Sequence, residues 1–130
     1  MMCEERLKVE QDILKSRLPE NSYHFIDMNT SKPYLALAAK TNRGNIFTIR
    51  IELDEFPNMV PKMFVNKILL LKTGEPIPEY NSDWYTLECV DGMTGIRHYS
   101  NKSWTPMVSL YHVYLRGKMW LEMYESYLNS

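Results

Sequence analysis

Apolar residues recur every three or four positions in the first stretch of the chain, which is the spacing of one face of an α-helix. The apolar positions of this face are Leu7, Ile13, Leu14 and Leu18, and charged residues fill most of the places between them. Proline keeps the residue before it out of the helical region, so the pair Leu18 and Pro19 ends the predicted helix. We expect this helix to be amphipathic and to cover a core with one face.

The period then changes to two, which is typical of strands with one buried face. The clearest strand is 47–53, where apolar and polar residues alternate throughout. Shorter candidates are 23–28 and 33–41, and the glycine-containing stretch 42–45 supplies the turn that follows them. The near-continuous apolar run 65–71 is typical of a strand covered on both faces. Successive strands with short turns predict a four-stranded antiparallel meander.

Residues 72–103 follow no period and are rich in glycine, proline and asparagine. An irregular stretch of that length inside a compact domain is usually functional. Its aromatic and polar residues favour an ordered loop over a linker, and they include Trp84, Tyr85, His98 and Tyr99.

The last segment has the strongest helical pattern. Thr105 is the expected N-cap, with Pro106 at the first helical position. The apolar stripe of this helix consists of Leu110, Val113, Gly117, Trp120, Leu121, Tyr124 and Leu128. Helix, four strands, a long irregular crossover and a second helix predict a single α+β domain over residues 1–130, with both helices on one side of an antiparallel sheet.

Composition excludes several classes of function. Of the 130 residues, 45% are hydrophobic and 24% charged, as in ordinary globular domains, and the net charge of −1 argues against nucleic-acid or membrane binding driven by positive charge. The two cysteines, Cys3 and Cys89, are far apart, which argues against a disulfide framework or a structural zinc site and predicts a cytoplasmic protein. We find no secretory signal, apolar span, phosphate-binding loop or metal-ligand motif, and expect no cofactor.

Two motifs resemble those of the ubiquitin-conjugating enzyme family. Phe56-Pro57, followed by Pro61, matches the family's Tyr-Pro-x-x-Pro-Pro element, with Val60 in place of the first paired proline. Gly95-Ile96 and the later Trp104-Thr105-Pro106 match its Gly-x-Ile-Cys stretch and its Trp-Ser-Pro. The resemblance covers nearly the whole chain and implies that family's fold, with residues 72–103 as the active-site loop.

The match extends to the bacterial branch of this family, which occurs beside ubiquitin-like and antiphage defence genes. The branch has, in order, an Ile-Cys-His-Tyr stretch, a Trp-x-Pro, a Ser-Leu-Tyr and a Gly-x-x-Trp-Leu-Glu-x-Tyr helix. This chain has the corresponding segments 96–99, 104–106, 109–111 and 117–124 in the same order. One departure is Arg97, which stands where the family has its thioester-forming cysteine. A second is Tyr85, where the branch tends to place a histidine.

Conjugation needs a thiolate that accepts a modifier's C-terminus as a thioester and then gives it up to an amine. A guanidinium cannot do this, so Arg97 marks either a natural inactive variant or a substituted cysteine. The resemblance implies that His98, Tyr99 and Tyr85 belong to the same site, although such loop aromatics also serve simply to pack a loop. It implies as partners a ubiquitin-like protein or conjugated defence protein and an activating-enzyme-like protein.

Three hypotheses therefore remain open. The first is a ubiquitin-conjugating-enzyme-like transferase, with Arg97 in place of its working cysteine. The second is a non-catalytic adaptor of the same fold. The third is a small cysteine hydrolase that uses Cys89 with His98, although an isolated cysteine between apolar neighbours is more typical of a buried packing residue.

Overall fold

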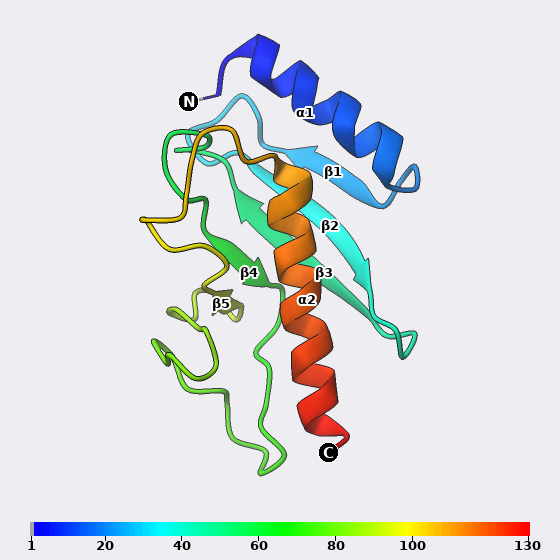
Figure 1. Ribbon diagram of the computed structural model, residues 1–130, viewed down its shortest axis with the longest axis vertical. Helices are drawn as coiled ribbons and strands as arrows, with labels where there is room; N and C mark the ends of the chain where they lie inside the picture. The colour runs from blue at the N-terminus through cyan, green and yellow to red at the C-terminus, as the bar shows by residue number, and fades with distance from the viewer. Residues whose placement is uncertain (1) are drawn as a thin grey trace.

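Two helices and a five-stranded antiparallel sheet make up the fold in the computed structural model, which describes residues 2–130. In chain order the elements are α1 (Glu4–Arg17), β1 (Tyr23–Ile26), β2 (Tyr34–Lys40), β3 (Ile46–Glu52), β4 (Met63–Val65), β5 (Thr94–Ile96) and α2 (Leu110–Leu128). The strands pair in the order β1-β2-β3-β4-β5, each antiparallel to the next. Helix α2 crosses one face of the sheet, and α1 lies beside β1 (Figure 1). The predicted α+β class is confirmed.

The first half of the chain follows its sequence pattern closely. Helix α1 ends at Arg17, with Leu18 as its extended C-cap residue. Along β3 the residues alternate between exposed or half-buried and buried, as the period of two predicts. Gly44 takes a φ of +87° in the turn between β2 and β3, a value that glycine adopts without strain.

The prediction of four strands is wrong at the far edge of the sheet. The run 65–71 contributes only Val65 to a strand, because four of the next five residues point to solvent. The backbone N–H of Leu69 instead donates to Thr94 Oγ1, and that of Leu71 to the carbonyl of Glu75. The fifth strand, β5, lies within the stretch predicted to be irregular. A three-residue strand containing Gly95 is too short to produce a visible period.

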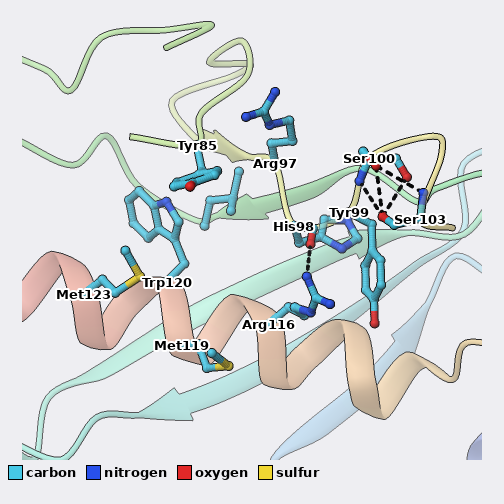
Figure 2. A pocket seen from close by; sticks show the side chains of 11 residues that line it. Tyr85, Arg97, His98, Tyr99, Ser100, Ser103, Arg116, Met119, Trp120 and Met123 are labelled. Carbon is cyan, nitrogen blue, oxygen red and sulfur yellow. Dashed lines mark hydrogen bonds between the residues drawn. The ribbon is translucent and has the colours of Figure 1, made fainter. Parts of the chain in front are cut away.

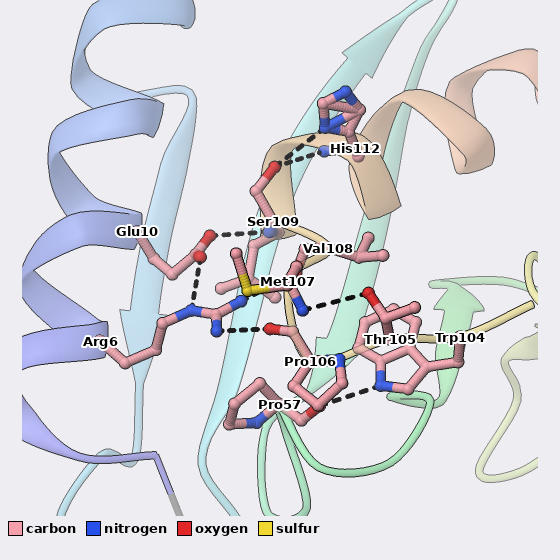
Figure 3. A network of polar contacts seen from close by, with 11 residues as sticks. Arg6, Glu10, Pro57, Trp104, Thr105, Pro106, Met107, Val108, Ser109 and His112 are labelled. Atoms are coloured by element: carbon pink, nitrogen blue, oxygen red, sulfur yellow. Dashed lines mark hydrogen bonds and ion pairs between the residues drawn. The ribbon is translucent and has the colours of Figure 1, made fainter.

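Helix α2 begins later than predicted. Its N-cap is Ser109, whose side chain accepts the backbone N–H of His112, and not Thr105 with Pro106. The reason lies in α1: Glu10 Oε1 accepts the Leu110 N–H at 2.7 Å, so this N–H makes no bond to Pro106 within a helix (Figure 3). The carbonyls of Pro106 and Val108 accept hydrogen bonds from Arg6.

The core lies between the sheet and α2. The predicted stripe of α2 is buried except at its last member, Leu128, which is 38% exposed. Gly117 faces the sheet so closely that a Cβ there would lie 2.6 Å from Met63 Sδ and 3.0 Å from Ile49 Cδ1. The absence of a side chain therefore sets how near α2 approaches β3 and β4, and so positions the opposite, outward side of the helix.

Candidate functional site

A cavity of about 480 Å³ lies between α2 and the segment that follows β5 (Figure 2). One wall comes from α2, and the other from residues 96–103 together with Tyr85. All four residues that the sequence singles out, Tyr85, Arg97, His98 and Tyr99, line this cavity. The remaining lining residues are Ile96, Ser100, Ser103, Arg116, Met119, Trp120 and Met123.

Strand β5 explains why Arg97 is presented to solvent. Ile96 pairs with Met63 of β4, forms a bridge to Thr86 on its other side, and is 1% exposed. Side chains alternate along an extended chain, so Arg97 points the other way and is exposed. Its backbone N–H donates to the carbonyl of Tyr85 at 2.9 Å, and its guanidinium carbon lies 5.5 Å from the centre of the Tyr85 ring. The cavity rim thus carries a cation where the resemblance places a thiol.

His98 is buried and faces away from Arg97. Its Nε2 lies 2.7 Å from the carbonyl oxygen of Pro61; a carbonyl only accepts, so Nε2 donates and carries the proton. Its Nδ1 is buried without a hydrogen-bond partner. Burial lowers the pKa of His98, and the nearby Arg116 lowers it further, against the opposing effect of the Pro61 carbonyl. We therefore assign His98 as a neutral imidazole that ties the cavity wall to the Pro61 turn.

Tyr99 is held in a cluster of rings. Its ring meets Trp104 edge to face at a centroid separation of 5.5 Å, and the guanidinium of Arg116 lies 4.1 Å from its centre. Arg116 also donates from Nη1 to the His98 carbonyl at 3.0 Å. The Trp104 indole N–H donates to the carbonyl of Pro57 at 2.9 Å. Tyr99 thus joins α2, the cavity wall and the Pro57 turn, which is a packing role.

Cys89 does not belong to this site. It is half-buried, and it is absent from the residues that line the cavity. Burial raises the pKa of its thiol, and Glu79 raises it further, so the thiolate is disfavoured at neutral pH. His98 in turn is buried with Nε2 bonded to Pro61. The structure therefore gives no support to a hydrolase built from Cys89 and His98, and the expectation of a buried Cys89 is met only in part, because the residue is half-buried.

The contribution of α2 to the site was not predicted from the sequence. Arg116, Met119, Trp120 and Met123 line the cavity, and their spacing of three, four and seven residues is that of one helix face. This face adjoins the buried stripe but contains a cation and two exposed methionines. An apolar pattern therefore does not mark it. Helical spacing starting at Arg116 was the signal that could have identified it.

Comparison of this chain with protein-family models, with curated proteins and with solved structures finds no match. Neither described helix is long and apolar enough to cross a membrane. Within residues 2–130 there is no group of three or more His, Cys, Asp or Glu side chains placed to hold a metal ion. The assignment of function therefore rests on the cavity and on the motifs of the sequence.

Proposed function

We propose that this chain is a ubiquitin-conjugating-enzyme-like protein of the bacterial branch in which Arg97 replaces the thioester cysteine. Its cavity then holds the C-terminal segment of a ubiquitin-like protein, or of a conjugated defence protein, without a covalent bond. In this role the chain is an adaptor that presents the segment to a partner of the conjugation pathway, such as an activating-enzyme-like protein. The partners and the pathway are inferred from the resemblance alone.

One observation carries the non-catalytic form of the proposal. The residue that follows buried Ile96 is an exposed arginine at the rim of the cavity, and no cysteine is among the lining residues. Thioester formation needs a sulfur nucleophile, and a guanidinium remains protonated throughout the range in which proteins work. The order of helix, antiparallel sheet, irregular segment and helix agrees with the family resemblance and supports the same reading.

The second candidate is an enzyme silenced by one substitution. It is favoured by the placement of Arg97, whose side chain is exposed while its backbone is fixed by the hydrogen bond to Tyr85. A cysteine there would keep the same backbone position and would be accessible to a modifier. We expect Arg97→Cys to react with iodoacetamide faster than Cys89, whose thiol is half-buried and has a raised pKa.

The test uses intact mass measurement after incubation with a ubiquitin-like protein and its activating enzyme, with Arg97→Ala as the matched control. The unaltered chain and Arg97→Ala should form no adduct. Their intact masses are the reference for Arg97→Cys. A reductant-sensitive adduct on Arg97→Cys, mapped to residue 97, supports the family assignment. If Arg97→Cys labels no faster than the native cysteines and forms no adduct, and the unaltered chain binds no ubiquitin-like protein in calorimetry, the proposal is wrong.

A further inference from the structure

The cavity carries positive charge that no neighbouring carboxylate neutralises. Arg97 and Arg116 both line it, and none of its lining residues is acidic. The ion pairs found within residues 2–130 involve neither arginine. One N–H of Arg116 donates to the His98 carbonyl, and the Arg97 guanidinium lies beside the Tyr85 ring. Each guanidinium has five N–H donors, so most of them remain available to an anionic ligand.

The two cations lie on opposite walls of the cavity. Arg97 extends from the end of β5 and points away from α2, whereas Arg116 extends from α2 toward the backbone at His98 (Figure 2). A ligand that satisfies both guanidinium groups therefore needs two separate anionic groups. Ser100 and Ser103 add hydroxyl groups to the same lining. Ser100 Oγ donates to Ser103 Oγ at 3.0 Å and accepts the Ser103 N–H, which leaves it one lone pair that can accept an N–H of a ligand backbone.

Beyond Arg116 along α2, the cavity has an adaptable apolar surface. Met119 and Met123 lie one turn apart on the same face of α2. Their side chains are 63% and 58% exposed. Trp120 lines the cavity with them. Methionine side chains bend to fit different partners and are used at surfaces that accept varied apolar side chains. Exposed methionines beside Arg116 favour a ligand that carries apolar side chains next to a carboxylate.

From this arrangement we propose that the cavity binds an extended acidic peptide segment of a partner protein. One carboxylate of the peptide pairs with Arg97 and a second with Arg116, and apolar side chains next to the second carboxylate pack on Met119 and Met123. The inference rests on the proposed function and deepens it, since it gives the chemistry of the segment that the cavity takes. Charge complementarity selects the peptide, and Arg–carboxylate pairs supply directional hydrogen bonds.

A fluorescein-labelled peptide of sequence Gly-Glu-Leu-Leu-Glu-Gly provides the probe, read by fluorescence anisotropy at low salt. Two further peptides carry Gln or Lys in place of both Glu residues. We expect the acidic peptide to bind at least about tenfold more tightly than the Gln peptide, because a charged hydrogen bond contributes roughly that much, and the Lys peptide not to bind. Equal binding of the acidic and Gln peptides would overturn the proposal.

Two variants locate the site, each with a matched control elsewhere on the surface. Arg97→Glu should weaken binding of the acidic peptide by at least about tenfold, whereas Arg43→Glu, in the exposed turn between β2 and β3, should not. Met119→Glu should weaken it as well, whereas Met107→Glu, at a residue that is 87% exposed and outside the cavity lining, should not. Equal losses in a variant and its control would place the binding elsewhere.

A thymidine oligonucleotide of equal charge distinguishes peptide recognition from simple attraction of anions. Binding of the oligonucleotide at the affinity of the acidic peptide would show a general anion site and would overturn the proposal. The outcome is also separable from that of the proposed function. If the peptide binds as expected but Arg97→Cys forms no adduct and no ubiquitin-like protein binds, the peptide site stands and the assignment to conjugation falls. If instead the peptide does not bind but Arg97→Cys forms the adduct, the peptide site is ruled out and the assignment to conjugation stands.

Discussion

Glu10 is buried in α1, although the amphipathic pattern places it among the charged residues outside the apolar face. Its side chain is 1% exposed, accepts the Leu110 N–H through Oε1 and pairs with Arg6 Nε at 2.9 Å through Oε2 (Figure 3). Arg6 also donates hydrogen bonds to the carbonyls of Pro106 and Val108. One ion pair thus satisfies backbone groups at the start of α2 that the helix itself cannot satisfy.

Replacing this carboxylate should be costly. Glu10→Ala leaves the Leu110 N–H without its acceptor and Arg6 without its counter-charge, and breaking a buried pair costs about 3–5 kcal/mol. We expect a loss of that order in the free energy of unfolding, measured by urea denaturation. Glu5→Ala, at an exposed position of the same helix, is the control and should change it by less than about 0.5 kcal/mol. Equal effects of the two variants would contradict this role of Glu10.

His98 predicts how stability depends on pH. Burial lowers its pKa in the folded protein below the ordinary value of 6.5, so the folded state binds fewer protons than the unfolded state as the pH falls through that region. Its contribution is complete above about pH 6.5 and decreases as the pH falls toward the lowered pKa. In urea denaturation, His98→Gln should flatten this decline, whereas His24→Gln, at an exposed residue, should leave it unchanged. An unaltered slope in His98→Gln would contradict the neutral buried imidazole.

At the scale of elements, segments with a visible period were predictable, down to the four residues of β1, whereas the three-residue strands were not. The repeat of two along β3 and the proline after Leu18 are local signals, and each fixes its element. Strands β4 and β5 have three residues each, so their positions depend on partners distant in sequence. The start of α2 depends on Glu10, a hundred residues earlier, and no local pattern contains that information.

Gly95 has a role that its place in β5 makes testable. A Cβ on Gly95 would clash with the carbonyl oxygen of Glu88. The Leu87 N–H donates to the Gly95 carbonyl at 2.9 Å. Gly95→Ala therefore pushes against backbone and should lower the free energy of unfolding by about 1–3 kcal/mol in urea denaturation. Gly92→Asn is the control: its φ of +76° suits asparagine, and no atom lies within 4 Å of the added Cβ. A smaller loss in Gly95→Ala than in the control would be inconsistent with this packing.

Over the whole molecule, α2 holds the long irregular segment through its aromatic side chains. The indole N–H of Trp120 donates to the Trp84 carbonyl, and the Tyr124 hydroxyl donates to that of Leu70, each at 2.7 Å. The Tyr127 hydroxyl accepts the Lys72 N–H at 3.0 Å. These bonds attach residues 70–84 to the same helix that covers the sheet. Figure 1 shows the segment running beside the last turns of α2.

We therefore expect sheet, helices and irregular segment to unfold together. Trp84 and Trp120 report on the irregular segment by fluorescence, and far-ultraviolet circular dichroism reports on helix and sheet. The two signals should give one coincident transition in urea, which is the behaviour of a single cooperative unit. A fluorescence transition at clearly lower urea would show that the segment melts separately. Trp104→Phe removes the indole outside that segment and sharpens the comparison.

The grouping of the site residues was predictable only in part. The resemblance brought Arg97, His98 and Tyr99 together because they adjoin in sequence, and Tyr85 joined them through its place in the motif. It did not indicate that His98 turns toward the carbonyl of Pro61, because that contact joins residues 37 positions apart in the sequence. Arg116 and the methionines of α2 reach the cavity only through tertiary packing.

The bonds from α2 to the irregular segment also set an order of events during synthesis. The ribosome synthesises the residues of the five strands and residues 70–84 before it adds Trp120, Tyr124 and Tyr127. Until these three residues emerge, the carbonyls of Leu70 and Trp84 lack the donors that fix them. The nascent chain therefore passes through a stage in which the residues of its sheet have been made and its cavity does not exist, so a chaperone or a ligand acting before α2 emerges meets a protein without a binding site.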